Sequence, residues 1–386
     1  MADADRMNAS AADARGMTAR ELRADIPALG DAAYFNFGAH GPSPRYVVEA
    51  ASAFIADHEY GSAATDPYTH AFETYETVRK RIAAFVGAEP EEIALTESTT
   101  DGINRIAGAI DWEPGDVVVR TDLEHPAGVL PWKRLEREGV KVRVVETENG
   151  QIDREAYADA VADARLVCFS AITWTHGTRL PVADLVDIAD DAGAFTLVDA
   201  VQSPGQVPID VTDWGADAVA AAGHKWVLGP WGAGFLYVDA GAAIDLAPRA
   251  VGYRSVESPN DGEVAYKPGA KRFEVGSTTP AAHVGLVEAL DAIEAVGVDA
   301  IGSRIESLTD RLKAGIPADR LLSPERYESG LVTIDVDDPE ATVERLAADD
   351  IVVRSLPHPA AVRVSVHAVS TVAEIDRLVE ALNEEW

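Results

Sequence analysis

The side chains best suited to chemistry in this sequence are a lysine and an aspartate that each follow an apolar run. Lys225 closes a Gly-His-Lys sequence directly after the run 217–222, and Asp199 ends the run 194–198. A lysine amine can form a Schiff base with an aldehyde, and a carboxylate can keep a pyridine nitrogen protonated, so that the ring accepts electrons. The pattern therefore predicts a pyridoxal 5'-phosphate (PLP) site with Lys225 and Asp199 as catalytic residues.

A second group of residues could hold the phosphate of this cofactor. Ser98, Thr99 and Thr100 follow a short predicted strand and open a predicted helix, where backbone N–H groups and the helix dipole favour an anion. An ordinary helix cap explains the same residues when they are considered alone, so their role depends on the nearby lysine and aspartate. His224 is a further candidate donor to the phosphate, and a histidine without a function is the alternative.

Four more residues are candidates for contacts with the ring and the substrate. His125 follows a predicted strand, and its imidazole could stack on the pyridine ring as a third catalytic residue; a solvent-exposed loop histidine is the alternative. Gln202 could donate to the ring hydroxyl oxygen or belong to a turn. Arg354 and Arg363 could each bind a substrate carboxylate through two parallel hydrogen bonds, or form surface salt bridges.

These residues need elements that bring them together. From about residue 70 the apolar spacing alternates between helix and strand periods, which is typical of an α/β fold with a mostly parallel sheet. In such sheets ligands bind at the carboxyl ends of the strands, where Asp199 and Lys225 are expected. The predicted strands are 92–96, 116–120, 141–145, 165–172, 195–199, 217–222 and 233–238, with helices at 68–86, 99–110, 128–138, 153–162 and 183–192.

The chain, with 386 residues, is too long for one ordinary domain. We expect a disordered acidic tail over 1–20, an N-terminal arm and large PLP-binding domain over 21–284, and a smaller α+β domain over 285–386. A helix over 279–296 is expected to cross between the lobes. The small domain is expected to pack against the segment 20–44 and to contain strands at 330–336, 351–354 and 361–366.

The composition is strongly acidic. The chain has 65 acidic and 33 basic residues and a formal net charge of −32, spread along its length. Self-repulsion of this size destabilises a compact state, and molar salt shortens the Debye length to about 3 Å. We therefore expect a halophilic source; a merely acidic mesophilic protein is the alternative. The same charge argues against nucleic acid and anionic membranes as partners.

Cysteine content and hydropathy indicate the cellular compartment of the protein. Cys168 is the single cysteine, so no internal disulfide is possible and a reducing cytoplasmic environment fits. No run of about 18 apolar residues suggests a membrane span, and the first 20 residues lack the apolar core of a secretory signal. No metal site is expected.

The motifs together resemble those of the class V aminotransferase family of fold-type I PLP enzymes, which includes cysteine desulfurases, selenocysteine lyases and isopenicillin N epimerase-like proteins. The resemblance extends from about Tyr34 to the C-terminus and is strongest over 198–211, 215–217 and 223–225. It implies a seven-stranded, mostly parallel sheet and a homodimer with a shared active site. In that dimer Ser277, in Arg-Phe-Glu-Val-Gly-Ser, would reach the phosphate bound by the neighbouring subunit.

The sequence also departs from this family in ways that bear on the reaction. Desulfurases carry a cysteine on a loop after the position of Arg354, whereas this chain reads Ser-Leu-Pro-His-Pro-Ala over 355–360. Ala222 replaces a serine before Gly-His-Lys, and Trp174 replaces an asparagine near the cofactor, while 173–181 looks most like the epimerase-like branch.

These departures place amino-acid transamination or epimerisation first among the expected reactions. A C–S or C–Se lyase that lacks the usual loop cysteine is the alternative, and a non-catalytic PLP-binding regulatory protein is a third reading. A doubly wound nucleotide-binding protein fits less well, because no Gly-x-Gly-x-x-Gly or P-loop sequence occurs.

Overall fold

The computed structural model describes residues 16–384, apart from positions 31, 65, 243–244 and 263. Most of the tail predicted over 1–20 lies outside these residues. The end of that tail is packed, since the Met17 N–H donates to the Ala295 carbonyl oxygen at 3.0 Å and helix α2 spans Ala19–Ala24. Residues 17–20, which the prediction assigned to the tail, are therefore packed.

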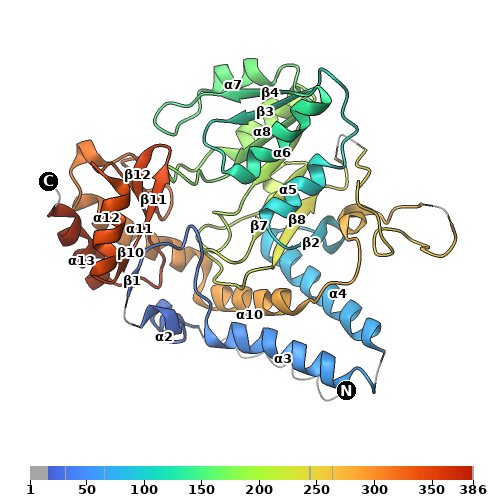
Figure 1. Cartoon of the computed structure of the whole chain (residues 1–386), viewed down its shortest axis with the longest axis horizontal. Coiled ribbons are helices and arrows are strands. Elements are labelled where there is room, and N and C mark those ends of the chain that lie inside the picture. The colour runs from blue at the N-terminus through green and yellow to red at the C-terminus, as the bar shows by residue number, and fades with distance from the viewer. Residues whose placement is uncertain (1–15, 31, 65, 243–244, 263, 385–386) are drawn as a thin grey trace.

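A seven-stranded sheet forms the centre of the large domain (Figure 1). Its strands are β2 Ile93–Thr96, β3 Val117–Thr121, β4 Lys141–Val145, β5 Leu166–Ser170, β6 Phe195–Asp199, β7 Ala218–Ala222 and β8 Gly234–Val238. The spatial order is β2-β8-β7-β6-β5-β3-β4, and β8 alone runs antiparallel to its neighbours. The mostly parallel seven-stranded sheet is therefore confirmed.

The two faces of this sheet are covered by different helices, because side chains alternate along each strand. On β5, Val167 and Phe169 belong to one apolar cluster, and Leu166 and Cys168 to another. The first cluster includes residues of α4 Pro67–Val86, α7 Arg154–Val161, α8 Val182–Asp191, α9 Val211–Trp214 and α10 Ala281–Val296. The second includes residues of α5 Thr99–Ala107 and α6 Leu130–Leu135.

The small domain has its own sheet and core (Figure 1). Strands β9 Leu331–Ile334, β11 Arg354–Pro357 and β12 Ala360–Ser365 form an antiparallel sheet in the order β11-β12-β9. A parallel pair joins β1 Ala33–Tyr34 to β10 Ile351–Val352, so the N-terminal segment packs on this domain, as expected. Helices α11 Val298–Ala314, α12 Pro339–Ala348 and α13 Val372–Asn383 complete it.

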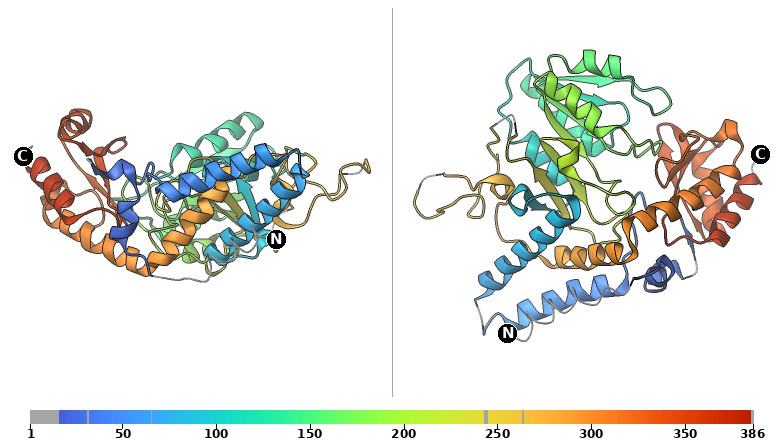
Figure 2. Two further views of the ribbon diagram at one scale, coloured as in Figure 1. Left: turned by 90° about the horizontal axis from the view of Figure 1, so that it is seen from below. Right: turned by 180° about the vertical axis from the view of Figure 1, so that it is seen from behind.

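Helix α3, Arg45–Gly61, lies along α10 in both views of Figure 2. The sequence did not predict α3, and the burial explains why. Only Val47 and Phe54 of α3 are buried, so its apolar stripe is too thin to give a clear helical period. None of the helices within the described residues is long and apolar enough to cross a membrane.

The segment 355–360 also differs from expectation. The sequence predicted strands at 351–354 and 361–366, but β11 spans Arg354–Pro357 and turns directly into β12. Two prolines in this stretch suggest a loop, yet proline is tolerated at the edge of a sheet, and β11 is the edge strand. The hairpin fixes Arg354 directly opposite Arg363, a pairing that decides the geometry of the site below.

Candidate active site

A cavity of about 410 Å³ lies where β2, β6 and β7 end and where the β11–β12 hairpin approaches them. It collects all of the predicted site residues except Ser277. The lining consists of Gly38, Ala39, His40, Ser98, Thr99, Thr100, His125, Ala127, Trp174, Asp199, Val201, Gln202, His224, Lys225, Trp231, Arg354 and Arg363.

Lys225 follows β7 on a loop whose backbone contacts the N-terminal segment at Gly41. The Gly41 N–H donates to the His224 carbonyl oxygen at 2.8 Å, and a Cβ at Gly41 would overlap the Lys225 carbonyl oxygen. Burial lowers the pKa of Lys225 to about 7; Asp199 opposes this shift, while Arg363 and Arg354 add to it. The amine is therefore largely neutral just above pH 7, as a nucleophile or proton acceptor must be.

Asp199 ends β6 at the bottom of the cavity. It is only 4% exposed, and its carboxylate accepts a hydrogen bond from the Val201 N–H at 3.0 Å. Burial raises the pKa of Asp199, whereas that hydrogen bond and Lys225 lower it. A carboxylate in this position can pair with a protonated ring nitrogen.

Glu124 is a buried carboxyl group that the sequence reasoning missed. It accepts hydrogen bonds from the hydroxyls of Thr121 and Ser170, each at 2.6 Å, and from the Ser170 N–H at 3.2 Å. Burial raises the pKa of Glu124 to about 7, and Asp199 contributes to that rise. Its position directly before His125 was the available signal, but an acidic residue in a loop usually indicates an exposed side chain.

His125 caps the short helix Pro126–Gly128, and its Nδ1 accepts a hydrogen bond from the Ala127 N–H at 3.2 Å. That bond leaves the proton of the neutral ring on Nε2. Burial, followed by the charge of Lys225, lowers the pKa of His125 to about 4, so the ring is neutral. Trp174 packs edge-on against it with ring centroids 5.1 Å apart.

The N-terminus of α5 presents the predicted phosphate-binding residues. The Ser98 hydroxyl accepts a hydrogen bond from the Asp101 N–H at 3.1 Å, which is ordinary capping. The Thr99 hydroxyl is different, because it is buried and has no hydrogen-bond partner within the described residues. A buried polar atom without a partner at a helix N-terminus fits an anion such as a phosphate.

Gln202 and His224 lie beside these groups. The Gln202 amide is oriented from both sides, since its oxygen accepts from Trp226 Nε1 at 2.7 Å and its nitrogen donates to the Gly38 carbonyl oxygen at 3.0 Å. The second hydrogen of that nitrogen is available for a ligand. The His224 ring stacks on Trp231 with centroids 4.7 Å apart, and burial lowers its pKa to about 4.

Arg354 and Arg363 enter the cavity from the small domain. Arg363 is 1% exposed and donates from Nη1 to the Trp174 carbonyl oxygen at 2.9 Å. Burial and the neighbouring Arg354 lower the pKa of Arg363 to about 9. The Arg354 guanidinium lies 5.9 Å from the centroid of the Trp174 ring.

Ser277 lies outside the cavity of its own chain. It is exposed, and its hydroxyl is hydrogen-bonded to the Tyr253 hydroxyl.

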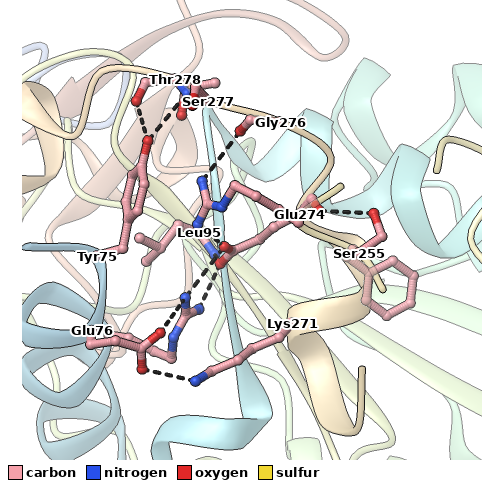
Figure 3. Close-up of polar contacts among 12 residues, drawn as sticks. Tyr75, Glu76, Leu95, Ser255, Lys271, Glu274, Gly276, Ser277 and Thr278 are labelled. Carbon is pink, nitrogen blue, oxygen red and sulfur yellow. Dashed lines mark hydrogen bonds and ion pairs between the residues drawn. The ribbon is translucent and has the colours of Figure 1, made fainter. Parts of the chain in front are cut away.

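The buried residues beneath Ser277 form an ion-pair network (Figure 3). Glu274 binds Arg79 at 2.6 Å and also binds Arg254, whose guanidinium lies 3.7 Å from the Tyr75 ring centroid.

Two aromatic residues of the cavity were also not predicted as site residues. His40 lies 5.3 Å from Trp231 and 6.4 Å from His224 between ring centroids, so the three rings form one cluster. Trp231 is 65% exposed. No periodicity marks these residues, because they lie on loops that only the folded chain brings together.

Known proteins resemble this chain along almost its whole length. The aminotransferase class-V family model matches residues 33–378. A probable cysteine desulfurase of Methanothermobacter thermautotrophicus is 32% identical over 392 residues, which cover 95% of this chain and 98% of the relative. The apo structure of a cysteine desulfurase from Thermococcus onnurineus NA1 superposes with a TM-score of 0.86 and 28% identity, covering 94% of this chain and 97% of that one.

A further solved structure is that of the cystine C–S lyase C-DES in complex with its product, cysteine persulfide. It is 27% identical, has a TM-score of 0.86, and covers 93% of this chain and 99% of its own. Relatives that cleave C–S bonds support the lyase alternative more than the transamination or epimerisation that the sequence reasoning placed first. The chain belongs to the class V aminotransferase family, it is a PLP-dependent enzyme, and its cofactor is PLP.

Proposed function

We propose that the protein is a C–S lyase that acts on a sulfur-containing α-amino acid and releases the sulfur group directly, without first transferring it to a cysteine of its own. The observation that carries this proposal is the β11–β12 hairpin. The residues 355–360, where the resemblance to desulfurases places a cysteine, contain none.

The single cysteine cannot take over that role. Cys168 is completely buried in β5, and burial raises its pKa well above the ordinary value. A sulfur acceptor must be an accessible thiolate. Relatives named for activity on cysteine and cystine, together with the missing acceptor thiolate, support a reaction in which the sulfur leaving group enters solution.

The residues of the cavity suit the cofactor. Lys225 would hold its aldehyde carbon, Asp199 its ring nitrogen, and the N-terminus of α5 with the free Thr99 hydroxyl its phosphate. His125 would lie against the ring and Gln202 near the ring hydroxyl oxygen. When bound, PLP supplies an electron sink for the bond that is broken at the substrate α-carbon.

The protein groups would then move the proton and hold the substrate. Lys225 Nζ would take the proton from the α-carbon, which its lowered pKa of about 7 permits at neutral pH. Arg363 would hold the α-carboxylate. The carbon–sulfur bond breaks with its electron pair on sulfur, and after hydrolysis by water the remaining atoms leave as pyruvate and ammonium.

Product analysis tests this proposal. The PLP-loaded enzyme is incubated with L-cystine and with L-cysteine, and pyruvate, ammonium, alanine and D-amino acids are quantified. We expect pyruvate and ammonium in equal amounts from at least one substrate. Alanine as the main product would indicate desulfurase chemistry, a keto acid without ammonium would indicate transamination, and inverted substrate would indicate epimerisation; each outcome contradicts the proposal. Absence of any turnover with PLP bound would favour the regulatory reading.

We also propose that the enzyme is a homodimer in which Ser277 contacts the phosphate in the other subunit. The face around Ser277 is unusually apolar for a surface, since Tyr68, Phe72, Tyr253 and Val275 are each at least 38% exposed. Mixing an inactive Lys225→Ala variant with an inactive Ser277→Asp variant tests this arrangement. Activity should reappear, because one site of each mixed dimer would have both intact residues; no recovery would place Ser277 in its own subunit.

A further inference from the structure

We infer that Arg354 binds a second acidic group on the substrate, so that the enzyme prefers amino acids with an anionic side chain. This inference rests on the proposed function. The first observation is the register of the β11–β12 hairpin, in which Arg354 and Arg363 are direct cross-strand partners. Like charges directly opposite each other destabilise a sheet, and both arginines line the cavity. An arrangement of this kind requires anions in the cavity.

Arg363 can account for one of these anions. Its Nη1 is occupied by the Trp174 carbonyl oxygen at 2.9 Å, whereas Nε and Nη2 are buried and have no partner within the part of the chain that the structure describes. A Cβ at Gly38 would come within 3.1 Å of Nη2, so the glycine gives the guanidinium its space. Two parallel free donors match a single carboxylate, and the α-carboxylate of the substrate satisfies them.

Arg354 remains available after that assignment. It is half-buried, and no residue among those described forms an ion pair or hydrogen bond with its guanidinium. Its contact is the Trp174 ring, 5.9 Å from guanidinium to centroid. A guanidinium that lines the cavity beside an already assigned one is placed to bind a second anion.

The charges of the other lining residues support a second anionic group. Lys225, Arg354 and Arg363 are basic, and Asp199 is the single acidic residue among the lining residues. Burial lowers the pKa of each lining histidine, so the imidazoles are neutral and neither add to this positive charge nor offset it. The cofactor phosphate is assigned to the α5 end, which the large domain supplies, and not to the arginines of the small domain.

A substrate with a distal acid fits this arrangement, and cysteine itself lacks one. Amino acids in which the sulfur carries a carboxylate-bearing group, including disulfides of two amino acids, belong to this class. The near-isosteric pair S-carboxymethyl-L-cysteine and S-carbamoylmethyl-L-cysteine differs by one charge at the far end. We expect the acid to have a kcat/KM about 10- to 100-fold above that of the amide, the range for a hydrogen bond to a charged group.

A binding experiment separates this inference from the proposed reaction. Succinate and its monoamide succinamate have no amine and cannot react, and their dissociation constants for the PLP-loaded enzyme can be measured by calorimetry. We expect succinate to bind about 10- to 100-fold more tightly. Arg354→Gln should remove the preference, Arg354→Lys should retain part of it, and the surface control Arg134→Gln should leave it unchanged, because Arg134 pairs with Glu138 away from the cavity.

The outcomes are distinguishable. Equal affinities for the two ligands in the wild-type enzyme, or a preference that survives in Arg354→Gln, would overturn the inference. A clear preference for succinate in an enzyme that releases no pyruvate from cystine, cysteine or either cysteine derivative would leave the inference standing and refute the proposed C–S lyase reaction. If Arg354→Gln does not fold, the inference is tested by the ratio of the succinate and succinamate dissociation constants in the wild-type enzyme and in Arg354→Lys.

Discussion

Two arginine clusters of this protein differ in the charge of the groups beside them: Arg79 and Arg254 lie beside Glu274, and Arg354 and Arg363 lie beside each other. In the network beneath Ser277, Arg79 is 1% exposed and both of its terminal nitrogens donate to the Glu274 carboxylate, at 2.6 and 3.3 Å. Arg363 is equally buried, but the charged group with the largest effect on its pKa is another cation, Arg354. The first cluster has its acidic partner within the chain, whereas Arg363 forms no ion pair with any of the described residues.

The pKa directions follow from this difference. Burial acts against the charge of both arginines. At Arg79 the attraction of Glu274 and Glu76 outweighs burial, and the pKa is raised. At Arg363 the repulsion of Arg354 adds to burial, and the pKa falls to about 9. A buried arginine without an acidic partner therefore costs stability, and its retention points to a role in binding.

The largest expected effect comes from removing the unpaired arginine. Arg363→Met should lower kcat/KM by about 100- to 10,000-fold, because two charge-assisted hydrogen bonds to the α-carboxylate are lost. Its thermal midpoint should stay constant or rise, since an unpaired buried charge is replaced by an apolar side chain. Steady-state kinetics and differential scanning calorimetry measure the two quantities. A lower midpoint together with normal kinetics would make Arg363 structural and remove the contrast with Arg79.

The next effect concerns the paired cluster. Glu274→Gln should reduce the free energy of unfolding by about 3–5 kcal/mol, because two buried guanidinium groups lose their partner. Chemical denaturation measures this change, and Asp376→Asn, which breaks the exposed pair with Arg311, is the matched control and should have no measurable effect. A Glu274 variant as stable as the control would show that the buried ion pairs of this network do not contribute to the free energy of unfolding.

Salt should change the contribution of the surface charges to stability far more than that of the buried ion-pair network. The net charge of −32 predicts that the free energy of unfolding rises between 0.1 and 2 M KCl, because the Debye length falls from about 10 Å to below about 3 Å. The destabilisation by Glu274→Gln should persist at high salt, because salt screens buried pairs far less. Denaturation curves at both concentrations give the two values. Full stability in dilute buffer would contradict the halophile hypothesis.

The smallest effect links the cavity arginines to Lys225. The uptake of PLP by the apo-protein, followed by its visible absorption, should become faster as the pH rises through about 7, where Lys225 loses its proton. Arg363→Met should move this midpoint to higher pH, because a cation that disfavours the protonated amine is removed. A midpoint that does not change between the two proteins would show that the charges are not coupled.

Sequence reasoning selected residues that the structure brings into one cavity, but it was less successful with their surroundings. Lys225, Asp199 and the Ser98 region each lie at or just after the end of a strand in a mostly parallel sheet, and the rule that ligands bind at such strand ends needs no tertiary information. Glu124 was missed because a carboxyl group in a loop is normally exposed. Helix α3 was missed because few of its residues are buried. Strands at 351–354 and 361–366 were predicted, but the extension of β11 to Pro357, and with it the register of the hairpin, was not.

The amino-acid order alone determined the α/β class, the PLP chemistry and the absence of a cysteine where a sulfur relay would need one. These properties depend on local periodicity and on which residue types are present. The tertiary structure alone decided that Arg354 faces Arg363, that Glu124 lies buried near Asp199 and that Arg79 meets Glu274. Such contacts join segments far apart in the chain, and no local pattern encodes them, because they depend on how separate elements pack.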